Sequence, residues 1–223
     1  MKVFSILAAI LFLLCSVLNL IGQFMGTRQL SRMTKPYLMP TLLVFTLSWL
    51  LISSAPSWTI LLYVVALLFH TGGDILLLFP TMKFFLRGLI SFLVGHIFYI
   101  AIFSDGLGNM NWIYFALSYG ILLSLACFLF VKVKKHGVIM AFAVALYALL
   151  LGTVFVSCLS CAISRFSIYT FLLPVGSSLF ILSDSMIAYA RFKCRFKNHN
   201  FYVMLTYILA QALISVGIIG MQF

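Results

Sequence analysis

Apolar segments of about twenty residues fill this chain, and this feature restricts its fold more than any other. A helix needs about 20 apolar residues to cross the hydrocarbon core of a bilayer. On that measure we place eight spans at about residues 3–22, 36–54, 58–79, 86–104, 111–131, 137–159, 167–190 and 201–221. The connections are too short to hold a soluble domain. The sequence therefore predicts an all-α polytopic membrane protein, with eight transmembrane helices in one bundle and a single domain over residues 1–223.

The composition agrees with this prediction, since 65% of the residues are hydrophobic and only 8% are charged. In a soluble protein, the net charge of +11 would suggest nucleic acid as a partner. Here the basic residues lie in short loops between apolar segments, where they set topology and contact anionic lipid headgroups. We therefore expect membrane lipids and no nucleic acid as partners. The sequence carries no signal for an oligomeric state.

Lysine and arginine are distributed unevenly between the two sides of the predicted bundle. Of the 14 such residues, all but Lys2 and Arg165 fall near the connections that follow the first, third, fifth and seventh spans. Cytoplasmic loops are enriched in these residues. We therefore expect both termini on the non-cytoplasmic side.

Two aspartates lie inside the apolar segments, in a chain that has only three acidic residues. Asp74 belongs to the third predicted span and Asp184 to the seventh, whereas we expect Asp105 in a solvated turn. A carboxylate inside a bilayer costs about 2.5–3.5 kcal/mol on insertion scales, so it is usually paired, protonated or functional. Both aspartates lie roughly 10 Å from the cytoplasmic ends of their spans. Their separation of about half the chain also suggests a weak repeat of four plus four helices.

Other polar side chains fall at a similar depth in the predicted helices. Any single tyrosine or glutamine is explained more simply by a hydrogen bond to a neighbouring helix. Two aspartates at equal depth instead favour a functional site. The layer predicts a cavity that opens toward the cytoplasm. We expect its lining, and the substrate-binding residues, to be Lys35, His96, Tyr99, Tyr147, Tyr207 and Gln211.

The paired aspartates suggest acid–base chemistry. Two carboxyl groups in a cavity of low dielectric cannot both ionise cheaply, so we expect one to keep its proton. Such a pair supplies an acid and a base together, and we name Asp74 and Asp184 as the catalytic candidates. His70 shares a helix face with Asp74. The metal-ligand patterns H-x-x-x-H and H-E-x-x-H are absent, so we expect neither a metal nor another cofactor.

Several short motifs follow one another in a specific order. They are Lys35-Pro36, Gly73-Asp74, Gly88, Gly95-His96, Tyr99, the stretch from Gly176 to Asp184, Tyr189, Arg191-Phe192, Tyr207 and Gln211. With these motifs the chain resembles the YhhN family of membrane proteins, whose characterised members are lysoplasmalogenases.

The resemblance implies hydrolysis of the vinyl ether bond of a lysoplasmalogen, which gives a fatty aldehyde and a glycerophospho-ethanolamine or -choline. We expect the cell inner membrane of a bacterium as its location. Asp74 and Asp184 would protonate the alkenyl carbon and stabilise the resulting cation. Lys35, at the cytoplasmic mouth, would hold the phosphate of the lysophospholipid substrate.

Other functions fit parts of the same pattern. A non-enzymatic transporter or lipid-binding protein would also place polar groups at one depth. A metal-dependent lipid hydrolase could use His70, His96 and the two aspartates. An intramembrane aspartyl protease also uses two membrane aspartates, but its G-x-G-D signature fails here because Thr71 occupies the first glycine position.

Overall fold

The apolar segments form long α-helices. The structure, a computed structural model, describes residues 2–108 and 110–223 apart from the side chains of Lys2 and Asp105. The helices are α1 (Lys2–Phe24), α2 (Arg28–Ile52), α3 (Ser57–Leu76), α4 (Met82–Ile102), α5 (Ser104–Gly108), α6 (Trp112–Val133), α7 (Val138–Ser164), α8 (Ile168–Phe192) and α9 (His199–Gly220), and a 3-10 turn, η1, spans Lys134–His136. Eight of the helices in this range are long and apolar enough to cross a membrane, and none of the described residues forms a strand. The predicted all-α polytopic bundle is confirmed.

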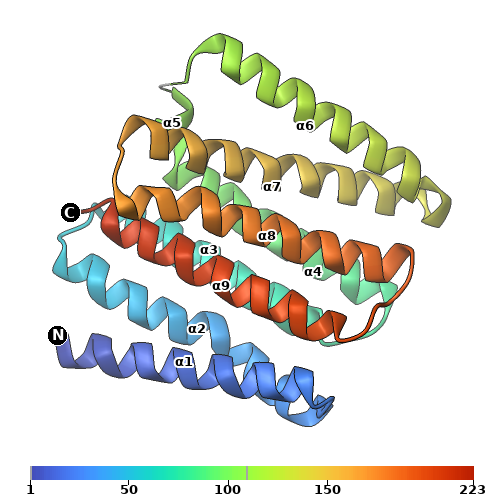
Figure 1. Cartoon of the computed structure of the whole chain (residues 1–223), viewed down its shortest axis with the longest axis horizontal. Helices are drawn as coiled ribbons and strands as arrows, with labels where there is room; N and C mark the ends of the chain where they lie inside the picture. The colour runs from blue at the N-terminus through green and yellow to red at the C-terminus, as the bar shows by residue number, and fades with distance from the viewer. Residues whose placement is uncertain (1, 109) are drawn as a thin grey trace.

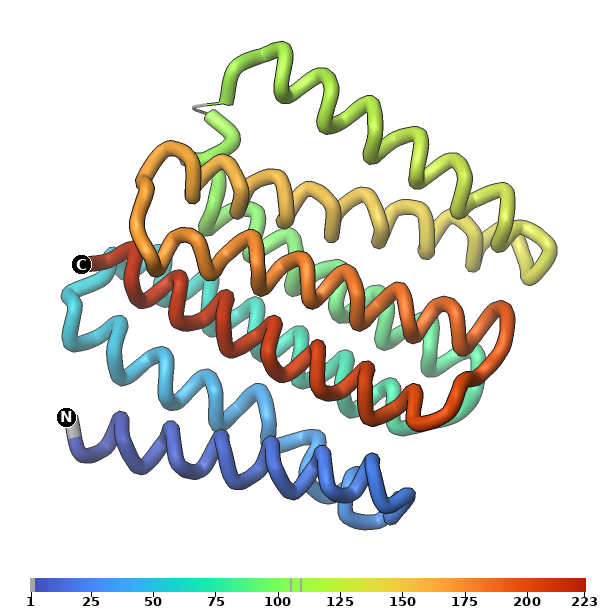
Figure 2. The backbone as a smooth tube through the Cα atoms, in the orientation of Figure 1, coloured from blue at the N-terminus to red at the C-terminus, as the bar shows by residue number. Residues whose placement is uncertain are grey.

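The long helices lie side by side along a common direction (Figures 1 and 2). Helices α8 and α9 lie in front of α3 and α4 in this view, α1 and α2 pack on one side, and α6 lies at the opposite edge against α7 (Figure 1). Both termini lie at one end of the bundle. The connections near residues 25–27, 77–81, 134–137 and 193–198 lie at the other end, which we call the basic end.

Helix α2 begins earlier than the sequence predicts. Pro36 was expected to open this span, but it lies inside the helix together with Pro40. The loop expected to carry Arg28, Arg32 and Lys35 is instead the first two turns of α2. Because these three residues are spaced by four and three positions, they share one face of the helix.

Helix α1 explains why the turns before Pro36 are helical. The Asn19 side chain is fully buried between α1 and α2. Its amide donates to the Ser31 carbonyl at 3.1 Å and to the Thr34 hydroxyl at 2.9 Å. Packing against α1 thus stabilises residues 28–35 as a helix, although these residues are too polar to be counted in the predicted span.

The loop before α4 is also shorter than expected. We predicted a basic loop over residues 80–87, but α4 begins at Met82, and the Thr81 hydroxyl accepts a hydrogen bond from the Phe84 N–H at its first turn. The Asp105 backbone belongs to the short helix α5, in place of the expected turn. The predicted solvation of the Asp105 side chain lies outside the described residues.

Three side-chain hydrogen bonds connect α3 to α9 at regular intervals. The pairs, with the distances between the bonded atoms, are Tyr63–Ser215 (2.6 Å), His70–Gln211 (3.2 Å) and Asp74–Tyr207 (2.8 Å). The partners recur every four residues on α9 and after seven and four residues on α3, so each set lies on one helix face. This three-rung ladder joins α9 to α3 along one face of each helix and places Tyr207 beside Asp74.

Glycines allow the close helix contacts beside this ladder. A Cβ atom on Gly95 of α4 would lie 2.8 Å from His70 Nε2. On the α8–α9 contact, a Cβ on Gly176 would lie 2.9 Å from the Ala210 carbonyl oxygen, and one on Gly217 would lie 2.4 Å from Leu173. Small residues of this kind let membrane helices approach closely. The packing therefore has no room for larger side chains at these positions.

Candidate active site

Asp74 lies where α2, α3 and α9 meet, and only 2% of its surface is exposed. The Lys35 ammonium of α2 lies 3.4 Å from the carboxyl oxygen Oδ1. The Tyr207 hydroxyl of α9 donates a hydrogen bond of 2.8 Å to the other oxygen, Oδ2. Both oxygens of Asp74 therefore have a partner, and one partner is a cation.

Asp184 lies on α8 in a different environment. Its carboxyl group is partly buried and accepts a short hydrogen bond from the Tyr147 hydroxyl of α7. Among the described residues, Asp184 has no cation within ion-pair distance. Each of the two aspartates therefore has its own tyrosine partner, Tyr207 for Asp74 and Tyr147 for Asp184.

A second polar cluster lies one helical turn further from the basic end. The Tyr99 hydroxyl donates to Gln211 Oε1 at 2.7 Å, and the Gln211 amide lies 3.2 Å from His70 Nδ1. Since an amide nitrogen can only donate, His70 Nδ1 is the acceptor, and a neutral His70 ring carries its proton on Nε2. All three side chains are fully buried. This cluster therefore links α3, α4 and α9 inside the bundle.

His96 contacts this cluster through its ring. Its Nδ1 lies 2.6 Å from the Phe92 carbonyl oxygen, which can only accept, so Nδ1 carries a proton. The ring packs edge-on against Phe180, with centroids 4.7 Å apart, and against His70 at 5.1 Å. Within the part of the chain that the structure describes, Nε2 of both histidines is buried without a hydrogen-bond partner.

A hollow of about 390 Å³ opens at the basic end, and we call it the vestibule. Its walls include the first turns of α2, the connection over residues 77–80, and the end of α8 with the start of α9. The lysine and arginine side chains that line it are Arg28, Arg32, Lys35, Arg191 and Arg195, and the lining includes His199 but no acidic residue.

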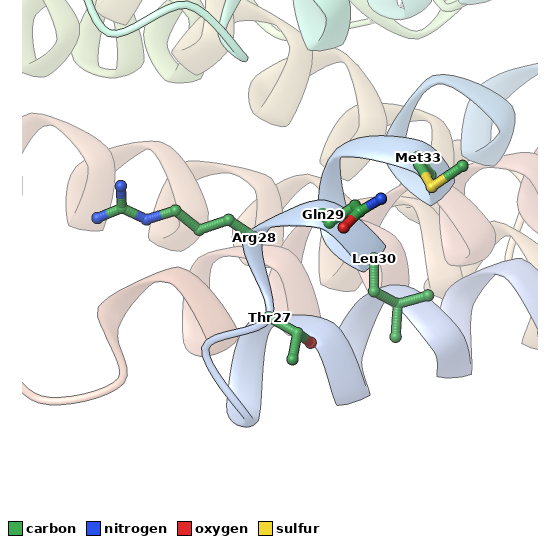
Figure 3. Close-up of a pocket in the computed structure, with 5 residues that line it drawn as sticks. All are labelled: Thr27, Arg28, Gln29, Leu30 and Met33. Atoms are coloured by element: carbon green, nitrogen blue, oxygen red, sulfur yellow. The ribbon is translucent and has the colours of Figure 1, made fainter.

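Another hollow, of about 500 Å³, lies on the surface at the first turn of α2 and is lined by Thr27, Arg28, Gln29, Leu30 and Met33. Figure 3 shows Arg28 extending away from Leu30 and Met33. Because Arg28 also lines the vestibule, the two hollows are neighbours.

The structure brings the predicted site residues together in pairs. Lys35 and Tyr207 contact Asp74, Tyr147 contacts Asp184, and Tyr99 contacts Gln211. Of the six residues predicted to line a cavity, Lys35 alone lines the vestibule. The other five are buried among the helices, each with at most 6% of its surface exposed.

Sequence reasoning missed two parts of this arrangement. His70 shares a helix face with Asp74, but its ring contacts Gln211 of α9. The sequence did contain a signal for this contact. His70 and Asp74 are four residues apart, as are Tyr207 and Gln211, so two facing helices can form both pairs at once. The vestibule arginines were assigned to loops, since polar residues at span ends are usually read that way.

A metal-dependent hydrolase would need several metal-ligating side chains close together. Among the side chains that the structure describes, no three or more His, Cys, Asp or Glu gather as metal ligands. The Nδ1 atoms of His70 and His96 are also engaged, by Gln211 and by the Phe92 carbonyl. The donor set therefore does not form a three-ligand site in this arrangement.

Comparison with known proteins gives one result. A sequence model of the YhhN family matches residues 30–218, which is most of the chain and includes both aspartates. No curated protein and no solved structure matches the chain.

Proposed function

Because this chain belongs to the YhhN family, we propose that it is a membrane hydrolase of the lysoplasmalogenase type. Its reaction is hydrolysis of the vinyl ether bond of a 1-alkenyl-glycerophosphoethanolamine or -choline. The observation that carries the proposal is the unequal pair of carboxyl groups. Asp74 has a lysine partner, whereas Asp184 has a tyrosine alone. Such inequality is how one site holds an acid and a carboxylate at the same time.

The two environments suggest a division of labour. Ion pairing with Lys35 and a hydrogen bond from Tyr207 stabilise a negative charge on Asp74. Asp184 has no such cation and is the better candidate to hold a proton. We therefore assign Asp184 as the general acid and Asp74 as the carboxylate that stabilises a cation.

The reaction can be written with these two groups. Asp184 gives its proton to the β-carbon of the vinyl ether, the C=C electrons form the new C–H bond, and an oxocarbenium ion results beside Asp74. Water adds to the α-carbon and returns a proton to Asp184. The hemiacetal then breaks its bond to the glycerol oxygen, which takes the hydroxyl proton, and leaves a fatty aldehyde. A water-poor site strengthens the attraction between the cation and Asp74.

A second candidate is a transporter or lipid-binding protein without catalysis. It is favoured by the Lys35–Asp74 ion pair, because buried pairs of this kind also occur along ion and proton paths in membranes. This candidate does not explain why Asp184 has a tyrosine partner and no cation while Asp74 has a lysine partner, and we rank it second. The metal-dependent hydrolase has less support, because its histidines are engaged elsewhere.

The decisive test uses two substrates that differ in one double bond. We expect purified protein to release a fatty aldehyde and an equal amount of glycerophosphoethanolamine from a lysoplasmalogen. The matched saturated 1-alkyl ether should give neither product, because it has no alkene to protonate. Binding of both lipids without aldehyde from either would favour the lipid-binding candidate. Activity that disappears with a chelator and returns with a metal would favour the metal hydrolase.

We also propose that the basic end faces the cytoplasm of a bacterium and that the protein lies in its inner membrane, since all but Lys2 and Arg165 of the 14 lysines and arginines belong to that end. A topology reporter fused after Phe223 should then report a location outside the cytoplasm. A fusion at Gly137, in the connection between η1 and α7, should report the opposite side. A cytoplasmic signal from the C-terminal fusion would reverse the orientation.

A further inference from the structure

We propose that the vestibule is the binding site for the phosphate of the lipid headgroup, and that its arginines, rather than Lys35, hold that phosphate. The inference rests on the proposed function for the identity of the lipid. The chemical class of ligand is a phosphate ester with a small polar headgroup.

The walls of the vestibule supply cations from two sides. Arg28 and Arg32 come from one face of α2, and Arg191 and Arg195 come from the end of α8 and the residues after it. The volume of about 390 Å³ falls within the range of ligand pockets, about 300–1,000 Å³. A guanidinium group matches the geometry of phosphate through two parallel N–H donors. The site is therefore built for a small anion.

These cations have no anion among the described residues. Lys35–Asp74 is the single ion pair in that part of the chain, so Arg28, Arg32 and Arg195 remain unpaired. Clustered cations of one sign repel each other, and an anion between them relieves that repulsion. Lys35 differs from them because Asp74 already balances its charge.

Arg191 is the member held most firmly in place. Its guanidinium lies 5.0 Å from the Phe85 ring centroid and donates to the Pro80 carbonyl oxygen at 3.4 Å. Its Nε is buried and has no partner within the described residues. An unsatisfied donor of a charged group is costly in a buried position. A phosphate oxygen at this wall of the vestibule is the kind of acceptor that Arg191 lacks.

Lys35 joins the vestibule to the carboxyl pair. Its side chain lines the vestibule, and its ammonium contacts Asp74. In a lysoplasmalogen, the three-carbon glycerol unit alone separates the phosphate from the vinyl ether. A phosphate held by the arginines would therefore direct the ether past Lys35 toward Asp74. The apolar chain would continue among the helices.

The basic residues could instead serve only to orient the protein and contact any bilayer. A control arginine separates these two roles. Arg87 lies near the same end on α4, is exposed, and stacks over Phe84 at 5.5 Å, but it does not line the vestibule. Arg32→Gln and Arg195→Gln remove vestibule charges, and Arg87→Gln removes the same charge elsewhere at the basic end.

Calorimetric binding of soluble glycerophosphoethanolamine to the detergent-purified protein tests the site without turnover. We expect Arg32→Gln and Arg195→Gln to weaken binding at least about tenfold, in line with loss of a charged hydrogen bond. Arg87→Gln should leave it unchanged. Inorganic phosphate as a second probe shows the source of affinity. Equal binding of both probes supports recognition of phosphate alone, and tighter binding of the ester supports recognition of the headgroup as well.

Two results would overturn the proposal. One is absence of binding of either probe to the unaltered protein. The other is an equal loss in all three variants, which would mean that general surface charge attracts the ligand. Because this experiment measures no aldehyde, it can succeed if the hydrolysis proposal fails, and it can fail if that proposal succeeds.

Discussion

Asp184→Asn should lower the turnover number for a lysoplasmalogen by roughly 10²–10⁴-fold, the usual contribution of a positioned general acid. The amide has the shape of the carboxyl group but no proton to give to the alkenyl carbon. The Michaelis constant should change little, because proton transfer takes place in the transition state. The measurement is steady-state release of aldehyde by the purified variant.

Two further variants make this result interpretable. Ser185→Ala changes the exposed next residue on α8 and should keep normal turnover. Tyr147→Phe removes the hydroxyl that positions Asp184 and should have a smaller effect than loss of the acid itself. An Asp184→Asn protein that is folded and turns over at the normal rate would exclude Asp184 as the acid.

Asp74→Asn should impair both stability and turnover, because Asp74 has two roles. The change leaves Lys35 as an unpaired cation with only 13% of its side chain exposed. Removing one partner of a buried ion pair costs about 3–5 kcal/mol. It also removes the carboxylate proposed to stabilise the oxocarbenium ion, so turnover should fall by several orders of magnitude. Thermal unfolding in detergent and aldehyde release measure the two effects.

The double variant Asp74→Asn/Lys35→Met separates these effects. It removes the uncompensated charge, so we expect most of the stability to return while turnover stays low. Recovery of activity together with stability would show that Asp74 acts only as a structural partner of Lys35.

The sequence was sufficient for the helices because span length and hydrophobicity are local properties. The fifth span offered no polar candidate, and α6 indeed lies at the edge of the bundle and contributes nothing to the site (Figure 1). The predicted start of α2 was wrong because the true start depends on hydrogen bonds from Asn19 on another helix. Local rules contain no information about such a contact.

The depth of the polar layer was predictable, but its pairings were not. Depth follows from the number of residues between a side chain and the end of its helix. The pairing of Lys35 with Asp74 depends on how α2 and α3 are rotated about their own axes. The pairing of Tyr207 with Asp74 depends on two helices far apart in the chain. These rotations come from packing of the whole bundle.

The three-rung ladder would tolerate one kind of misalignment between α9 and α3. If α9 slipped by one turn, about 5.4 Å, Gln211 would face Asp74 and Ser215 would face His70, so polar groups would still meet at two of the three rungs. At the third rung Ile219 would replace Ser215 opposite Tyr63, whose hydroxyl would keep its hydrogen bond to Thr46. Hydrogen bonding alone therefore discriminates only weakly between the observed register of α9 and the register shifted by one turn. The same slip would bring Met221 to the place of Gly217, where even a Cβ atom comes within 2.4 Å of Leu173. Close packing between α8 and α9 therefore excludes the shifted register and keeps Tyr207 opposite Asp74.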